Sequence, residues 1–210
     1  MRIMFETELK YRLDGEELAL KILEDDNLLA ARFENTTWQS VATHTTYYDT
    51  ATGVLRRNGI ALRMRREDGI CTMCCKYNEE VFYDSAVKMR VEHEVTFDEI
   101  PQSEGVPWQE LACAEMLSSL LAEENLVPVA ITEFSRTFLH IIWKYSRFEV
   151  AIDEGYLCQG ELRLPFRELE VEIKEEGSYE DLIDLGTYLQ ERYRLQVEPK
   201  SKLQRAIELC

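Results

Sequence analysis

Charged and apolar residues alternate along several segments of the chain, which is the pattern of β-strands that bury one face. Successive side chains of a strand point to opposite faces of a sheet. Near the N-terminus, ETELK therefore places Glu6, Glu8 and Lys10 on one face and Leu9 on the other. The pattern returns late in the chain in RELEVEIK, where three glutamates lie opposite three aliphatic residues.

The same reasoning predicts a series of short strands separated by polar or glycine-bearing turns such as ATG, RNG and EDG. The predicted strands cover residues 3–12, 43–50, 59–67, 70–77, 89–97, 131–143, 146–157 and 166–175. Because most of the connections are short, we expect neighbouring strands to form antiparallel hairpins.

Helical spacing of apolar residues predicts helices between these strands. We expect one helix over 14–32, one over 108–124 between Pro107 and Pro128, one beginning at the capping residue Ser178, and a last one over 201–209. The sequence has no internal repeat and no long linker, so we expect a single domain over residues 1–210.

These elements predict an α+β fold in which an eight-stranded antiparallel sheet is flanked by helices. Closing the sheet into a β-barrel would remove its exposed edges. If the helices cover the apolar faces, the charged faces point either to solvent or into the lumen of the barrel. A charged strand face usually meets solvent. The signs of the charges on each strand therefore decide whether these faces point to solvent or into a lumen.

Composition narrows the function classes. Forty acidic residues against 24 basic ones give a net charge of −16, which disfavours nucleic acid and anionic membranes as partners. No apolar run is long enough to span a membrane, and charged residues interrupt the N-terminal segment, so we expect a soluble cytoplasmic protein. A local cluster of Arg and Lys could still bind a small polyphosphate.

The six cysteines have no disulfide-framework spacing, and reduced thiols are expected. Cys71 and Cys74 form a CxxC, but no second ligand pair follows at the spacing of a zinc finger.

The signs of the charges differ between strands, which favours a two-sided site. Carboxylates concentrate on the first and last long strands, whereas Arg63, Arg65, Lys76 and Arg136 come from the middle ones. Clustered carboxylates with oxygen-only ligation suit Mg²⁺ or Mn²⁺, and Arg and Lys match phosphate oxygens. A compact polyanion such as a triphosphate fits this combination.

Several motifs occur in a fixed order: ETELK at 6–10, YYDT at 47–50, ALRMR at 61–65, TMCCK ending at Lys76, RVEHE at 90–94, SRTF with Arg136, AIDEG with Asp153, LEVEI with Glu170 and Glu172, and KSK with Lys202. Together they resemble the CYTH superfamily, the triphosphate tunnel metalloenzymes, whose signature is ExExK. That family includes inorganic triphosphatases, thiamine triphosphatases, class IV adenylyl cyclases and fungal RNA triphosphatases.

The resemblance implies an eight-stranded antiparallel tunnel and a role for each matching residue. Phosphates would be held by Lys10, Arg63, Arg65, Lys76, Arg136 and Lys202. Metal would be held by Glu6, Glu8, Glu170 and Glu172. Asp153 and Glu92 would complete the acidic lining as metal ligands or in orienting water. Three choices stay open, because Glu168 shares a face with Glu170 and Glu172, Lys200 could replace Lys202, and Glu94 could replace Glu92.

The resemblance favours hydrolysis of inorganic triphosphate to diphosphate and phosphate by a metal-activated water. The SK pattern at Ser201 and Lys202 is more similar to triphosphatase members, and no cyclase-like HFxxR segment follows the first helix. A class IV-type adenylyl cyclase and a thiamine triphosphatase are the alternatives within the family. A noncatalytic polyphosphate- or nucleotide-binding module and a structural sheet with solvated charges are alternatives of other classes. The oligomeric state stays open.

Overall fold

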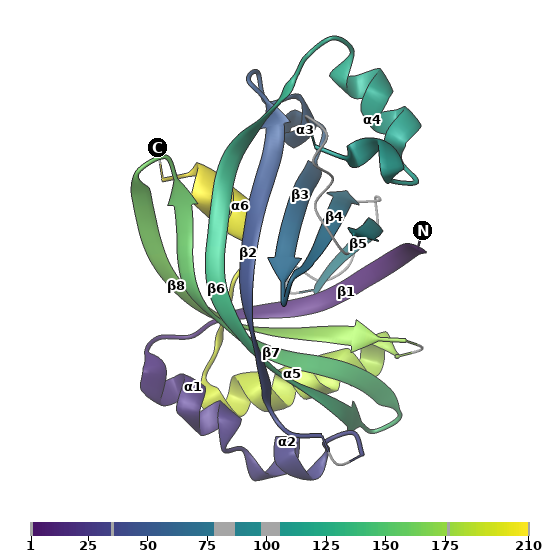
Figure 1. Ribbon diagram of the computed structural model, residues 1–210. Coiled ribbons are helices and arrows are strands. Elements are labelled where there is room, and N and C mark those ends of the chain that lie inside the picture. The colour runs from purple at the N-terminus through teal and green to yellow at the C-terminus, as the bar shows by residue number, and fades with distance from the viewer. Residues whose placement is uncertain (1, 35, 78–86, 98–105, 176, 210) are drawn as a thin grey trace.

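The computed structural model describes residues 2–34, 36–77, 87–97, 106–175 and 177–209. Eight long antiparallel strands follow one another around a closed sheet in the order β5-β4-β3-β2-β6-β7-β8-β1, and β1 also pairs with β5 (Figure 1). They are β1 (Arg2–Arg12), β2 (Gln39–Thr50), β3 (Ile60–Glu67), β4 (Ile70–Tyr77), β5 (Val87–Phe97), β6 (Leu126–Trp143), β7 (Ser146–Gln159) and β8 (Leu162–Lys174). A short strand, β9 (Gln196–Val197), extends the pairing of β1. The predicted eight-stranded antiparallel barrel is confirmed.

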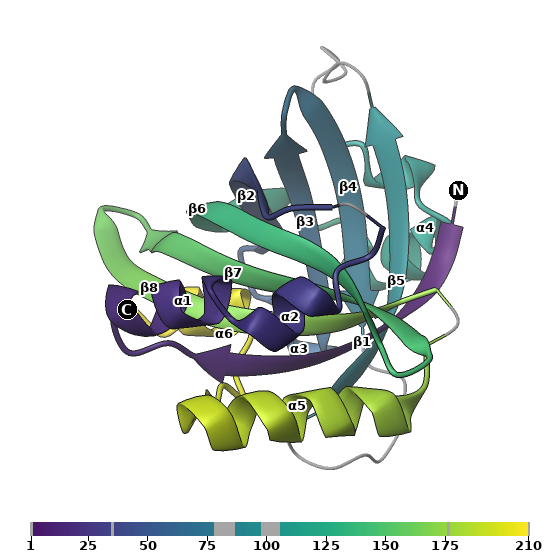
Figure 2. The ribbon, with the colours of Figure 1, turned by 90° about the horizontal axis from the view of Figure 1, so that it is seen from below.

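Helices pack on the outer face of the barrel, except the last one, which packs on inner-face residues such as Tyr47 and Phe134. They are α1 (Glu16–Leu23), α2 (Asp26–Ala30), α3 (Val54–Arg57), α4 (Ala114–Leu121), α5 (Tyr179–Tyr193) and α6 (Lys202–Ile207), with a 3₁₀ turn at Trp108–Glu110. Helices α1, α2 and α5 lie together along one side, and α4 lies near the opposite end (Figures 1 and 2). Helix α6 packs against β6 and β7. Among the described residues, no helix is long and apolar enough to cross a membrane.

The apolar faces of the strands point outward beneath these helices. Leu169 and Val171 of β8 are fully buried in the main core, where they meet α5 residues such as Leu182 and Leu185. Each such side chain contributes about 1.5 to 3 kcal/mol on burial. A second core lies between α4 and the outer faces of β3 and β4. Since side chains alternate along a strand, burying the apolar faces outside directs the charged faces into the lumen.

The helix predicted over 14–32 is wrong as one element, because the chain forms α1 and α2 instead. Asp25 caps α2, and its Oδ1 accepts hydrogen bonds from the backbone N–H of Asn27 at 2.8 Å and of Leu28 at 3.0 Å. Aspartate is a strong N-cap, so it ends one helix and begins the next. Its carboxylate also accepts hydrogen bonds from the hydroxyls of Tyr188 and Tyr193 on α5.

The helix predicted over 108–124 is too long at both ends. Its first residues form the 3₁₀ turn, Leu111 is extended, and Ala122 ends α4 with a positive φ of 50°. Pro128 does not bound a helix but lies inside β6. It sits where the register between β2 and β6 shifts, a site at which a strand tolerates the missing N–H of proline.

Position 155 of β7, which pairs with Phe134 of β6, has room for glycine alone. A Cβ atom on Gly155 would lie 2.1 Å from the carbonyl oxygen of Glu133 and 2.5 Å from the Cα of Phe134. We expect Gly155→Ala to lower the free energy of unfolding by about 1 to 3 kcal/mol, because backbone would have to move. Urea unfolding monitored by circular dichroism measures this loss.

Gly186→Ala on α5 is the matched control. Its Cβ would meet only the ends of side chains, Leu9 Cδ1 at 2.3 Å and the Tyr11 hydroxyl at 2.8 Å, which can shift. Alanine also improves helix propensity by about 1 kcal/mol. A loss of stability in Gly186→Ala equal to or larger than that in Gly155→Ala would show that the backbone contact at Gly155 is not the more costly one.

Candidate functional site

The lumen of the barrel holds a cavity of about 480 Å³ with a strongly charged wall. This volume lies in the range of small-molecule sites. Of the predicted site residues, those that line the cavity are Glu6, Glu8, Lys10, Arg63, Arg65, Lys76, Glu92, Arg136, Glu170, Glu172 and Lys202. Asp153 lies outside the lining and is fully buried.

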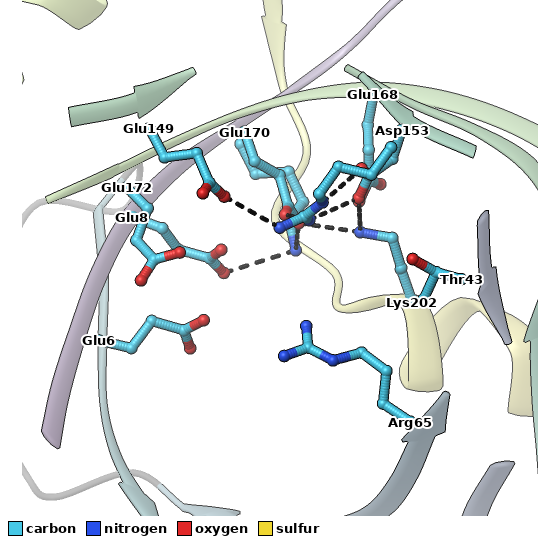
Figure 3. A network of polar contacts seen from close by, with 12 residues as sticks. Glu6, Glu8, Thr43, Arg65, Glu149, Asp153, Glu168, Glu170, Glu172 and Lys202 are labelled. Atoms are coloured by element: carbon cyan, nitrogen blue, oxygen red, sulfur yellow. Dashed lines mark hydrogen bonds and ion pairs between the residues drawn. The ribbon is translucent and has the colours of Figure 1, made fainter. Parts of the chain in front are cut away.

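One wall of the cavity carries carboxylates from three adjacent strands. Glu8 of β1 pairs in register with Glu172 of β8, which in turn pairs with Glu149 of β7. Figure 3 shows these side chains together with Glu6 on one side of the lumen, with Arg65 reaching in from the other side. The arrangement follows from the strand order, since β7, β8 and β1 are neighbours.

Positive charge on this wall only partly balances the carboxylates. Lys174 Nζ lies 2.8 Å from Glu172 Oε2. Burial nevertheless raises the pKa of Glu172 to about 7, against the effect of Lys174 and with a further contribution from the charge of Glu6. Glu172 is therefore a carboxylate that an added cation would stabilise.

The opposite wall is formed by β3, β4 and β5 and carries several basic groups. Lys76 Nζ lies 2.5 Å from Glu6 Oε1 and 3.0 Å from Glu92 Oε1, and Arg63 Nη2 lies 3.6 Å from the same Glu92 oxygen. Burial opposes ionisation of Glu92, but Lys76 and Arg63 hold its pKa at about 2. Arg65 lies farther along this wall, 3.8 Å from Glu94 Oε1.

A third group joins the barrel to α6. Arg136 donates two hydrogen bonds to the carboxylate of Asp153, from Nε at 2.8 Å and from Nη2 at 2.7 Å. Lys202 Nζ lies 2.7 Å from Asp153 Oδ2 and 2.9 Å from Glu170 Oε1, and it also contacts Glu168. Helix α6 begins with a capping box at Ser201 and Gln204, which places Lys202 in its first turn.

Two groups of described residues bring three ligand atoms within reach of one metal ion: Cys74, Glu92 and Glu94, and Asp153, Glu168 and Glu170. In the second group the Lys202 ammonium contacts all three carboxylates. The predicted metal set of Glu6, Glu8, Glu170 and Glu172 is not such a group, and it stays a prediction. Its donors are carboxylate oxygens, which fit Mg²⁺ or Mn²⁺ by their chemistry.

The structure distinguishes the residues in two of the three choices that the sequence left open. Lys202 faces the lumen, whereas Lys200 is exposed and forms an ion pair with Glu208. Glu168 contacts Lys202 and Arg205 and does not line the cavity, unlike Glu170 and Glu172. Both Glu92 and Glu94 line it.

Sequence reasoning gave no site role to several residues that line the cavity, among them Arg90, Glu149 and Lys174. Glu149 Oε1 lies 3.3 Å from Arg136 Nη1, and its other oxygen lies 3.1 Å from His140 Nε2. Strand alternation could have identified these three residues. Arg90, Glu149 and Lys174 share a strand face with Glu92, Asp153 and Glu172 respectively.

Comparison with known families accords with this geometry. The family model of the CYTH domain matches residues 4–207. The chain belongs to the CYTH family. The resemblance found in ETELK and the motifs after it is thereby confirmed.

One curated relative of this CYTH protein is the inorganic triphosphatase of Haemophilus influenzae, which is 32% identical over 154 residues. The match covers 73% of this chain and 42% of the relative, so the chain spans less than half the length of that relative.

Solved structures share the fold. A Bacillus halodurans protein solved as a candidate adenylate cyclase is 16% identical, with a TM-score of 0.63 and 98% of both chains covered. A Hippeastrum protein described as having a dominant triphosphatase activity is 20% identical, with a TM-score of 0.54 and coverage of 93% of this chain and 91% of its own.

We expect Lys202→Met to lower the free energy of unfolding by about 3 to 5 kcal/mol, because it removes a buried cation that contacts Asp153, Glu168 and Glu170 together. Guanidinium unfolding measures the change. The control Lys200→Met removes an exposed pair and is expected to cost less than about 1 kcal/mol. Equal losses in the two variants would show that Lys202 does not neutralise the buried carboxylates.

Proposed function

We propose that this CYTH protein is a metal-dependent triphosphatase that hydrolyses inorganic triphosphate to diphosphate and phosphate. The observation that carries the proposal is the cavity of about 480 Å³, whose lining combines a cluster of carboxylates with Arg and Lys side chains placed around the lumen. A metal bound to the carboxylates and a polyphosphate bound to the cations would neutralise both walls. The relation to the Haemophilus influenzae inorganic triphosphatase supports this choice of substrate.

The phosphates would be held by Lys10, Arg63, Arg65, Lys76, Arg136 and Lys202, all of which line the cavity. Their positions on several strands and on α6 place positive charge around the lumen rather than along one line. Such a distribution suits a short polyanion whose charge is spread over many oxygens. Arg forks would orient the phosphates, and Lys ammonium groups would add charge without fixing direction.

Metal would be held by Glu6, Glu8, Glu170 and Glu172. When bound, Mg²⁺ or Mn²⁺ would neutralise phosphate charge and lower the pKa of a water. The buried carboxylate of Glu172, whose pKa is raised to about 7, supports a cation at this wall. Lys10 contacts two of these glutamates, with Nζ 3.1 Å from Glu170 Oε1 and 3.5 Å from Glu8 Oε1, so it would lie beside the metal.

Glu92 and Asp153 would serve in different ways. Glu92 lines the cavity in ionised form and would orient an attacking water. Asp153 is fully buried and would act through its contacts, by fixing Arg136 and Lys202 where they reach the lumen.

We also propose that residues 1–210 form a single tunnel domain and that the protein works in the cytoplasm. The family match over residues 4–207 supports the first point. The cysteines of the described residues, Cys71, Cys74, Cys75, Cys113 and Cys158, are free, which supports a reducing compartment.

The proposal predicts that purified protein releases phosphate from inorganic triphosphate with Mg²⁺ or Mn²⁺ and loses this activity in EDTA. ATP and thiamine triphosphate, assayed in parallel, are expected to react more slowly. Glu8→Gln is expected to lower the rate by about 10- to 100-fold or more, because it removes a charged metal ligand while keeping the shape of the side chain.

Glu17→Gln is the control, since Glu17 is exposed on α1 and pairs with Lys21 in the same helix. Its activity is expected to match that of the unmodified chain. No phosphate release from inorganic triphosphate would contradict the proposal, and cyclic AMP formed from ATP would indicate the cyclase instead. Triphosphate binding that is unaffected in Glu8→Gln, with no turnover by either protein, would indicate a binding module.

A further inference from the structure

Arg90 bridges the two carboxylates of the ETELK motif. It lies on β5 directly opposite Glu6 of β1 in the antiparallel register. Its Nη2 lies 2.8 Å from Glu8 Oε1 and 3.1 Å from Glu6 Oε2. One guanidinium nitrogen therefore neutralises an oxygen on each of two glutamates that follow one another on the same face of β1.

Both carboxylates are among the four that the proposed function assigns to the metal. A guanidinium and a divalent cation cannot both bind these oxygens at close range, since they carry like charge. Arg90 and a cation therefore compete for Glu6 and Glu8. The other partners of the two glutamates, Lys76 and Lys10, approach from the sides and also contact Glu92 and Glu170 respectively.

Arg90 also has unused capacity to bind an anion. It lines the cavity, and its buried Nε has no hydrogen-bond partner. Arg63 lies near enough to repel it electrostatically. A phosphate oxygen between the two arginines would satisfy the free donor and offset this repulsion.

We propose that Arg90 couples metal binding to triphosphate binding. A cation at Glu6 and Glu8 releases the guanidinium, which then binds phosphate oxygens in the lumen. Conversely, a triphosphate that attracts Arg90 exposes the two carboxylates to the cation. By thermodynamic linkage each ligand tightens the binding of the other by the same factor. This inference rests on the proposed function, because that function assigns the metal to Glu6 and Glu8.

Arg90→Gln tests the coupling through Mn²⁺ binding without any triphosphate. Removing the competitor is expected to tighten Mn²⁺ binding by about fivefold or more, a size typical of coupling between sites. Electron paramagnetic resonance of free Mn²⁺ or titration calorimetry measures the affinity. A methylene-bridged triphosphate, which is not hydrolysed, is then titrated with and without Mn²⁺. Arg90→Gln is expected to weaken its binding mainly when Mn²⁺ is present.

Arg65→Gln is the matched control, because it removes one positive charge from the same cavity. Arg65 pairs with Glu67 and Glu94 and not with the ETELK glutamates. Its Mn²⁺ affinity is expected to stay within about twofold of the unmodified value, and its triphosphate binding to weaken with or without metal. Thermal melting of both variants establishes that they are folded. Mn²⁺ binding that is no tighter in Arg90→Gln than in Arg65→Gln would overturn the inference.

Phosphate release measured on the same samples separates the two proposals. Hydrolysis by the unmodified chain together with unchanged Mn²⁺ affinity in Arg90→Gln would overturn the coupling and leave the proposed function in place. Tighter Mn²⁺ binding in Arg90→Gln, with no hydrolysis by the unmodified chain, would support the coupling and overturn the triphosphatase. Absence of Mn²⁺ binding by every protein would overturn both.

Discussion

Closure of the sheet is the constraint from which the rest of the structure follows. Once β1 pairs with both β5 and β8, each strand has one face outside and one face in the lumen. The apolar faces pack beneath helices, so the charged faces are confined together away from bulk water. Burying charge is costly unless each group finds a partner of opposite sign, and the lumen contains an extensive network of such pairs.

The carboxylates of this network differ in how closely they are paired with cations. At the α6 end, Lys202 and Arg136 hold Asp153 and Glu170 in tight pairs, and those carboxylates already have their cations. Farther along β8, Glu172 pairs with Lys174, and burial still raises the pKa of Glu172 to about 7. The protein's own Lys and Arg residues therefore neutralise the carboxylates near α6, whereas the carboxylate of Glu172 can accept a further cation.

Sequence reasoning predicted the strands and most of the charged side chains that line the cavity, since strand alternation directly reports which side chains share a face. It failed where tertiary contacts decide the outcome. Asp25 splits a predicted helix because tyrosines of α5 and its own capping bonds hold it there. Pro128 fits within β6 because the register shifts at that point. Likewise, periodicity could not distinguish Asp153, which is fully buried against Arg136 and Lys202, from Glu149, which lines the cavity.

The contrast between Lys200 and Lys202 shows how a site of this kind depends on elements far from the signature motif. The two lysines are equivalent in the sequence pattern, yet the capping box at Ser201 sets the phase of α6 and places only Lys202 in the lumen. Lys202 then holds Asp153 of β7 together with Glu168 and Glu170 of β8. The first turn of α6 thus links the acidic strands β7 and β8. Lys10 in turn contacts both Glu170 of β8 and Glu8 of β1, which connects the network to the ETELK motif. The charge arrangement of ETELK is therefore set by the whole closed barrel and its last helix rather than by the motif alone.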